Sequence, residues 1–532
     1  MPAPQKETID KGEREVRTKY FQEFKGVYTK ASRNAIPQDH FYDLQNLMPI
    51  GAANLHTVPG PLLIQTVTGD TIYFSVFATL QSVDYLYLMG TSGKIYQYNI
   101  NSPALTTINP STLMGGTQTR MDQWKNSQIL FIDTTGYYSW DGTTFTQLTG
   151  GIIPTGTLTN PDIAVFSNHV WIYANRALYI GGINDYTATT GTGGYLVANG
   201  ATVALLVDPQ MRGQLVRMVS ASGYLYLFFK SSIFIISDVY IPTSASPPAA
   251  VYSQINVQAQ IGTDQYRAIF INDRNVIFGS KYGLMSLSGV DNTRLSDDID
   301  GTLQFIDPTF PISGGLVQVN NILNSALYFK TTGDPVFGTR YTVALHFDDK
   351  WWFSSTSPIA GQQYAFVSQG LAGNVPALFG FINTNGNSYV YQLFANVNTP
   401  DASSWQTALW PMEDILSRKE VLRAGFEVSY INNTQGAAVF TLNIDTETRS
   451  TPIPFSSAVG AVNWVNNSGA NVIWQNAAFT TVVWQNSGYA LYFGDGQGAF
   501  GRYVGFSGTA SQYTQYELDT YMMDYILRTR WT

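Results

Sequence analysis

The chain has 532 residues, of which 44% are hydrophobic and 14% aromatic, so it can form several domains and bury a large core. Only 12% of the residues are charged, about half the usual share, and the net charge of −8 argues against a protein that wraps nucleic acid with Lys and Arg. The sequence contains no cysteine, which excludes disulfide frameworks, thiolate metal sites and thiol catalysis.

The first 30 residues are rich in charges of alternating sign. They lack the apolar segment of a signal peptide, and the sequence has no run of about 18 apolar residues that could span a membrane. Glu13 and Arg17 are spaced as i and i+4, which favours a short solvated helix over Asp10–Tyr20. The alternatives are a disordered tail and an arm that becomes ordered against a neighbouring subunit.

Residues 24–59 consist of short apolar pieces interrupted by Gly, Pro and Asn. Such punctuation is typical of turns and extended segments. We therefore interpret residues 1–59 as a charged N-terminal arm followed by a lead-in.

Repeated units begin after residue 60. Each unit is an apolar strand, a polar turn with Gly or Asn, and a further strand, as in Ile261–Gly289, where Ala268–Ile271 and Val276–Gly279 flank a turn. The other units are Asp84–Ile100, Ser127–Leu148, Asn168–Ile183, Gly223–Ser237, Ala326–Ser355 and Leu378–Phe394.

The spacing of these units predicts the fold class. They start roughly 40 to 55 residues apart, which with about four strands each is the period of β-propeller blades. We predict an all-β fold with an irregular β-propeller of six to eight blades over residues 60–400. A stack of β-sandwiches is the competing interpretation, because regularly spaced short strands are typical of both.

A second boundary is predicted near Pro400. Trp405–Val421 has many charges and some helical potential, and we interpret it as a linker. Residues 420–532 read as strands, so residues 401–532 are predicted to be this linker and a C-terminal β-sandwich. Trp464, Trp474 and Trp484 recur at intervals of ten residues, which places them on one face if the strands are regular.

Three motifs could carry chemistry, and each has a simpler interpretation. Gly496–Gly501 matches the GxGxxG pattern of dinucleotide sites, but no helix can follow it, so we predict a glycine-rich hairpin loop. Ser139–Phe145 is similar to the Asp-box turn of sialidase-type propellers, yet the arginines that a sialidase needs are few and scattered. Asp297, Asp298 and Asp300 lack the bidentate Glu of a calcium loop, so we predict a solvated turn.

The histidines give no metal site. His40, His56, His169 and His346 lie far apart in sequence and form no HExxH or HxH pair. The sequence also has no GxSxG pattern and no P-loop. We therefore predict no catalytic, cofactor-binding or metal-binding residues, no cofactor and no enzymatic activity.

Stretches at both ends and in the middle of the chain share a family resemblance. Phe24–Pro49 combines a Gly-containing strand, an extended segment and an Asn ahead of a Pro, and His56–Gly60 is a short link that ends in Pro-Gly. Both resemble the opening of tail-tube (nozzle) and DNA-stabilising tail accessory proteins of short-tailed bacteriophages, although the Arg of their link is absent here. Further resembling stretches are Ile261–Gly289, Leu295–Ile299, Glu420–Phe426 and Gly501–Trp531.

The resemblance implies a structural virion protein. Such a protein is one subunit of a homo-oligomeric ring, usually a hexamer, that extends the channel of the portal and its adaptor protein. The ring retains the packaged genome and conducts double-stranded DNA without sequence-specific contacts during ejection. The resemblance also implies contacts with tail fibre or tailspike proteins, and a place in the virion tail after assembly in the host cytoplasm. Residues 1–30 would contact neighbouring subunits and the adaptor.

Two other functions stay open at this point. The first is a carbohydrate- or receptor-binding tail protein, in which Trp474 and its neighbours would stack on sugar rings. The second is a propeller hydrolase, which needs clustered carboxylates at the centre of the ring. The acidic, charge-poor composition is compatible with the nozzle, because such walls do not trap a polyanion.

Overall fold

The computed structural model divides the chain into two compact units. The propeller unit comprises Gly60–Asp349 and Ser355–Asn396, and the end unit comprises Met1–Pro59, Lys350–Ser354 and Val397–Thr532. The residues that the structure describes are 15–50, 54–187, 194–206, 208, 211–242, 248–258, 260–280, 282–355, 358–359, 361–397, 399–413, 415–429, 438–444, 447–454 and 489–528.

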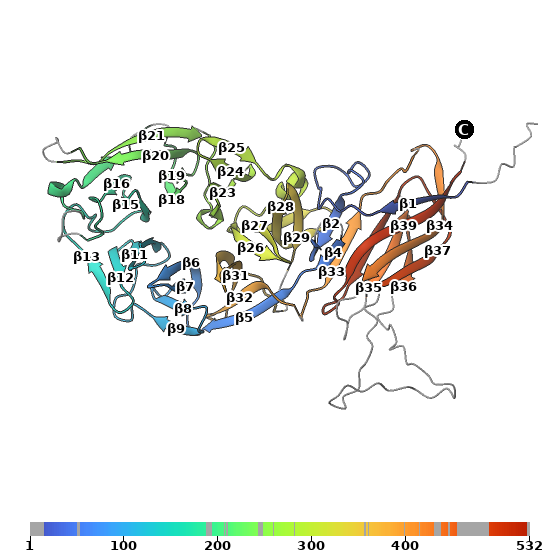
Figure 1. Cartoon of the computed structure of the whole chain (residues 1–532), viewed down its shortest axis with the longest axis horizontal. Coiled ribbons are helices and arrows are strands. Elements are labelled where there is room, and N and C mark those ends of the chain that lie inside the picture. Colours follow the sequence, from blue (N-terminus) through green and yellow to red (C-terminus); the bar gives the residue numbers. More distant parts are fainter. Residues whose placement is uncertain are drawn as a thin grey trace, which may run out of the picture. The chain divides into compact units, whose positions relative to one another are not determined.

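Seven antiparallel blades make up the described part of the propeller unit (Figure 1): six four-stranded sheets, and three strands that belong to a nine-stranded sheet. Blade 1 is β6 (Ile72–Leu80), β7 (Val83–Gly90), β8 (Ile95–Asn99) and β9 (Ala104–Thr107). Blade 2 is β10 (Arg120–Trp124), β11 (Gln128–Asp133), β12 (Gly136–Trp140) and β13 (Phe145–Leu148). Blade 3 is β14 (Asp162–Phe166), β15 (His169–Ala174), β16 (Ala177–Ile180) and β17 (Thr202–Leu205).

The remaining blades follow in chain order. Blade 4 is β18 (Leu215–Ala221), β19 (Tyr224–Phe229), β20 (Ile233–Tyr240) and β21 (Val251–Gln258). Blade 5 is β22 (Ile269–Asn272), β23 (Asn275–Ser280), β24 (Gly283–Ser288) and β25 (Asp291–Arg294). Blade 6 has β26 (Ser313–Val319), β27 (Ile322–Asp334) and β28 (Gly338–Phe347) in this unit. Blade 7 is β30 (Phe366–Ala372), β31 (Val375–Thr384), β32 (Asn387–Asn396) and β5 (Gly60–Val67).

The first strands of neighbouring blades lie side by side and close a ring. Strand β10 contacts β6 and β14, β14 contacts β18, β22 contacts β26, and β30 contacts both β26 and β6. The first strand of the propeller unit closes the ring, because β5 pairs with β32 of blade 7. This pairing runs from Val67 opposite Ser388 to Gly60 opposite Asn396. This arrangement is a seven-bladed β-propeller and confirms the predicted propeller of six to eight blades.

Apolar side chains fill the space between neighbouring blades. Trp171 of blade 3 is fully buried in one core with Leu227 and Phe229 of blade 4, and a similar core joins Phe228 of blade 4 to Phe278 of blade 5. Each sheet therefore buries both of its faces, which an isolated blade cannot do. The predicted repeats coincide with the middle strands of the blades, such as β23 and β24 within Ile261–Gly289.

Short helical turns occur in the connections. They are η1 (Val197–Asn199), η2 (Tyr266–Ala268), η3 (Asp297–Ile299) and α1 (Asp300–Leu303). Within the described residues, no helix is long and apolar enough to cross a membrane.

The end unit contains two groups of paired strands from both ends of the chain. The first group is β1 (Arg17–Phe21), β3 (Leu47–Ile50), β4 (Asn54–Thr57), β34 (Arg418–Ser429), β37 (Tyr489–Gly501) and β39 (Glu517–Arg528). The second is β2 (Phe41–Gln45), β29 (Lys350–Ser354), β33 (Ser403–Thr407), β35 (Ala438–Ile444), β36 (Glu447–Pro454) and β38 (Val504–Ala510).

Aromatic contacts join the two groups. The ring of Phe426 in β34 stacks on that of Phe440 in β35 with centroids 4.7 Å apart. Tyr521 in β39 lies 5.8 Å from Trp405 in β33 and 5.1 Å from Phe506 in β38. These buried rings form the core of the unit. Its assignment to the β-sandwich class stays a prediction.

Three local predictions for this part of the chain were wrong. The described part of the expected helix Asp10–Tyr20 enters strand β1, which pairs with β39. Trp405–Val421 is not a linker with helical potential, because Trp405 and Trp410 are fully buried and their burial holds the segment in the core. Gly496–Gly501 belongs to strand β37 rather than to a hairpin loop.

The propeller unit begins at Gly60, as predicted, and ends at Asn396, close to the predicted residue 400, but the segments outside it are grouped differently from the prediction. Residues 1–59 were expected to be separate from residues 401–532, but β2 pairs with β33 and β4 pairs with β39. Backbone hydrogen bonding between distant segments therefore combines both ends of the chain in one unit. Sequence spacing contains no signal for such pairings.

Two glycines in turns of the propeller differ in the space available for a side chain. Both have positive φ, 83° at Gly93 and 76° at Gly69, but a Cβ at Gly93 would lie 2.4 Å from the carbonyl oxygen of Met114, whereas Gly69 has open space. We expect Gly69→Ala to destabilise the protein by about 1–2 kcal/mol through backbone strain. Gly93→Ala should cost at least about 1 kcal/mol more, because backbone atoms must move. Thermal unfolding of both variants measures this difference, and equal losses would contradict it.

Candidate functional site

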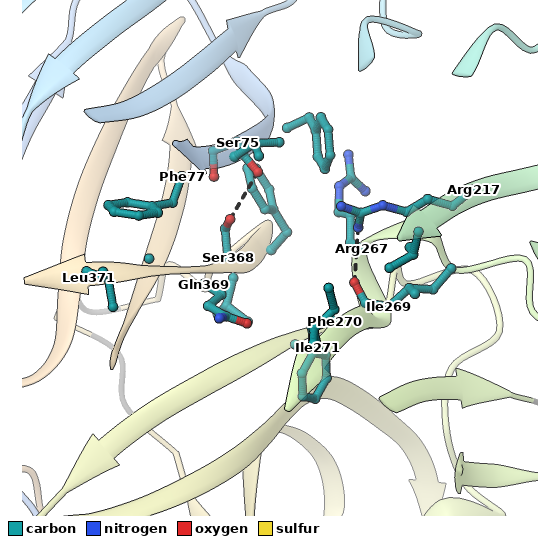
Figure 2. Close-up of a pocket in the computed structure, with 17 residues that line it drawn as sticks. Ser75, Phe77, Arg217, Arg267, Ile269, Phe270, Ile271, Ser368, Gln369 and Leu371 are labelled. Carbon is teal, nitrogen blue, oxygen red and sulfur yellow. Dashed lines mark hydrogen bonds between the residues drawn. The ribbon is translucent and has the colours of Figure 1, made fainter. Parts of the chain in front are cut away.

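The inner strands of the propeller surround a cavity of about 380 Å³ (Figure 2). Strands β6, β18, β22, β26 and β30 supply its walls. Phe77, Ile271 and Leu371 make much of the lining apolar. Two cationic side chains, Arg217 and Arg267, also line the cavity, and Figure 2 shows their side chains close together.

A second cavity of about 500 Å³ has a polar lining at the beginnings of the inner strands. Arg120, Lys230 and Gln118 line it, and Arg267 lines both cavities. We call Arg120 of β10, Arg217 of β18 and Arg267 of η2 the arginine layer, because they lie where the two cavities meet.

Backbone carbonyl groups hold two members of the layer. Nη1 of Arg217 donates to the carbonyl oxygens of Tyr266, at 2.9 Å, and Ile269, at 3.0 Å. Arg267 donates to the carbonyl oxygen of Tyr73 through Nε, at 3.0 Å, and through Nη2. These bonds connect inner strands of different blades, so the layer also ties the ring together.

Aromatic rings hold the third arginine. The guanidinium carbon of Arg120 lies 4.0 Å from the ring centroid of Tyr266 and 5.3 Å from that of Phe74. Arg120 donates to the carbonyl oxygen of Thr119 at 3.0 Å. Its Nε is buried and makes no hydrogen bond within the described part of the chain. Cation–π contacts of this kind stabilise a desolvated guanidinium.

Two carboxylates lie close to the arginine layer. Asp122 accepts a hydrogen bond of 2.6 Å from the amide of Val165 in the next blade, and Asp162 accepts one from the amide of Met218. Burial raises the pKa of each carboxyl group from 3.8 to about 6, while nearby arginines act in the opposite direction. Burial also lowers the pKa of Arg217, which the charge of Asp162 partly offsets.

The layer can hold an anionic group. Guanidinium groups match carboxylate and phosphate oxygens in geometry and charge. Asp122 and Asp162 line neither of these two cavities, and each accepts a hydrogen bond from a backbone amide. Among the described residues, the hydrolase alternative therefore gains no carboxylate that faces either of the two cavities. Cavities of 380 and 500 Å³ have the size of small-molecule pockets, not of a duplex channel.

The arginines contradict one sequence interpretation. They are scattered along the chain, but the fold brings Arg120, Arg217 and Arg267 together. Arg120 and Arg217 belong to inner strands that lie just ahead of recognised repeats, whereas Arg267 precedes β22 within the repeat Ile261–Gly289. Of the three, Arg217 alone is an isolated charge in an otherwise apolar strand, so no pattern common to the three arginines could have marked these positions from the sequence.

The other weighed positions lie away from the arginine layer. Asp297 of η3 and Asp300 of α1 form ion pairs with Arg294 at the end of β25. Asp141 accepts hydrogen bonds from Thr143 and Thr144 within its turn.

No group of three or more potential ligands among the described residues could hold a metal ion. His56 and His169 each bond a backbone carbonyl instead. Trp464, Trp474 and Trp484, on which the carbohydrate-binding alternative depends, lie outside the described residues.

Comparison with known proteins adds distant fold likenesses. No protein-family model matches the sequence, and no curated protein is similar to it. The WD40 repeats of RRP9 are similar over 64% of this chain and 99% of their own, with 8% identity and a TM-score of 0.37. BBS1N in complex with ARL6DN is similar over 64% of this chain and 100% of its own, with 9% identity and a TM-score of 0.39. The propeller assignment rests on the sheet order and the closed ring.

The buried carboxyl group of Asp162 predicts a pH dependence of stability. The pKa of Asp162 is about 6 in the folded chain, against the ordinary value of 3.8 in the unfolded chain. As the pH falls, the folded chain therefore takes up a proton at a higher pH than the unfolded chain does. The wild type should therefore gain about 2 kcal/mol of unfolding free energy relative to Asp162→Asn between pH 7.5 and 4.5. Thermal unfolding of both proteins across this range measures the gain.

Asp141 provides a control, because its effect on the pH dependence of stability should have the opposite sign. Desolvation there is outweighed by the Thr143 and Thr144 donors, so the pKa of Asp141 is lowered. The wild type should lose stability relative to Asp141→Asn as the pH falls. Equal pH slopes for the wild type and Asp162→Asn would contradict the prediction.

Proposed function

We propose that this chain is a structural subunit of the tail nozzle of a short-tailed bacteriophage. Copies of the chain form a ring, with six as the expected number, that continues the channel of the portal and its adaptor. The ring retains the genome and conducts double-stranded DNA during ejection. The protein is not an enzyme, and tail fibres or tailspikes attach to the same tail assembly.

The observation that carries the proposal is which sequence segments form the end unit. Of the stretches that resemble nozzle proteins, Phe24–Pro49 supplies β2 and part of β3, Glu420–Phe426 lies in β34, and Gly501–Trp531 contains β38 and β39. Stretches that are far apart in sequence thus form one core. The ring centroids of Phe24 and Tyr521 lie 6.0 Å apart there, and Arg33 bonds to Thr407, 374 residues further along the chain. A shared core is expected if these stretches derive from one ancestral domain.

The propeller interior supports a passage between subunits rather than through one of them. Phe74, Tyr266 and Arg267 lie at the centre of the ring of blades, where the cavities are small. A DNA duplex has a major groove that is alone about 12 Å wide. The proposed conduit is therefore the space that the assembled subunits enclose, with the propeller as a solid part of its wall.

Composition supports a wall that DNA passes without binding. The net charge is −8, and only 12% of the residues are charged. Binding to the phosphate backbone requires Lys and Arg that release counterions. The arginine layer is inside the propeller, with Arg217 held by carbonyl groups, so it is not available to a duplex.

The proposal predicts a ring with a defined partner. In native mass spectrometry and electron microscopy, the purified chain with its portal–adaptor complex should form a closed ring below the adaptor. Deletion of residues 1–14 should reduce adaptor binding at least about tenfold, a loss of 1.4 kcal/mol. The unfolding temperature of the deletion variant should match that of the full chain.

A neutral linker of equal length in place of residues 1–14 is the matched control. If charge carries the contact, the linker variant should bind as weakly as the deletion. A stable monomer that does not associate with the adaptor would contradict the proposed function. So would a ring whose central opening is too narrow for a duplex.

A further inference from the structure

The arginine layer retains hydrogen-bonding capacity that the protein does not use. Arg217 uses Nη1 for two carbonyl oxygens, and no bond of its Nε or Nη2 to another described residue is found. Arg267 uses Nε and Nη2 for the carbonyl oxygen of Tyr73, and its guanidinium group also interacts with the side chain of Tyr266. Buried or cavity-facing donors are costly when no acceptor is present.

The charges of the layer are also unbalanced. Asp162 interacts electrostatically with Arg120 and Arg217, and Asp122 with Arg217. No carboxylate of the described chain is found to act on Arg267, so one guanidinium charge of the layer is left without a carboxylate. No ion pair shorter than 4.0 Å joins Arg120, Arg217 or Arg267 to a carboxylate in the described structure. A single negative charge in the cavity would supply both the missing charge and the missing acceptors.

The cavity beyond the layer is largely apolar, although Ser75, Ser368 and Gln369 also line it. Phe77, Phe270, Ile271 and Leu371 line it together with Arg217. An inorganic ion would leave these surfaces without contacts, whereas an organic body would bury apolar area against them. The cavity of about 380 Å³ suits a ligand of modest size.

We propose that the centre of the propeller binds a small organic carboxylate. Its carboxylate accepts hydrogen bonds from Arg217 and Arg267, and its apolar body lies between β6, β22 and β30. A carboxylate fits better than a phosphate monoester, because it carries one charge and its two oxygens match the fork of a guanidinium group. This inference is independent of the nozzle proposal, since it concerns a cavity inside one propeller.

Calorimetry with four matched compounds tests the ligand class on the full chain. Hexanoate and benzoate should bind saturably, whereas 1-hexanol and benzyl alcohol should bind at least about tenfold more weakly. The loss of one charge-assisted hydrogen bond is enough for that difference. Hexyl phosphate should not exceed hexanoate. Equal binding of the alcohols, tighter binding of the phosphate, or no binding of either acid would overturn the proposal.

Variants locate the site from both ends of the ligand. Arg217→Gln removes the charge and should weaken hexanoate binding at least about tenfold, and the exposed Arg274→Gln should leave it unchanged. Leu371→Trp fills the apolar end without touching the arginines and should also abolish binding. Leu323→Trp, at a side chain that is 46% exposed, controls for the added tryptophan.

Direct observation keeps the proposal falsifiable if Arg217→Gln does not fold. In crystals of the unmodified protein with 4-bromobenzoate, the anomalous signal of bromine should lie between Ile271 and Leu371. Its carboxylate should lie within hydrogen-bonding distance of Arg217. Bromine only at other places, or a carboxylate that points away from the arginines, would overturn the proposal.

Discussion

The propeller depends on how the free edge of each innermost strand finds hydrogen-bonding partners. A blade ends at this strand, and unpaired backbone groups near the centre of the ring would be costly. Side chains of the neighbouring blade supply the partners. Gln123 accepts from the amide of Thr79, Asp122 from that of Val165, and Ser313 from that of Val367. Similar side-chain links to backbone groups join the other neighbouring blades: Asp162 to Met218, Arg217 to Ile269, Gln265 to Ile312, and Ser368 to Ser75.

This constraint explains why charges gather in the interior of an otherwise charge-poor protein. Acceptors for backbone amides are needed there, and in two blades they are carboxylates, Asp122 and Asp162. Buried carboxylates require nearby positive charge, and Arg217 supplies it while donating to the carbonyl group of Ile269 in blade 5. The arginine layer is thus first a consequence of ring closure. Its unused donors are what makes the cavity suitable for an anionic ligand.

The sequence predicted the parts of the fold that repeat and missed the parts that join them. The middle strands, such as β19 and β20, are long apolar runs with a turn between them, so their period was visible. Inner strands such as Arg120–Trp124 are short and interrupted by charges, and only the closed ring brings their side chains together. Pairings such as β1 with β39 and β5 with β32 join distant segments and leave no local pattern. For this reason, the propeller could be predicted, but neither the arginine layer nor the shared end unit.

The connectivity of the two units imposes an order on folding. The propeller unit begins at Gly60 and ends at Asn396, two residues that pair directly, so it can close as soon as blade 7 exists. The end unit pairs Arg17 with Tyr525, and the ordering of such distant segments is slow. The end unit therefore completes last, after nearly the whole chain is available. Because the end unit also contains the stretches that resemble nozzle proteins, the surfaces proposed for assembly require segments that follow the last strand of the propeller in the chain.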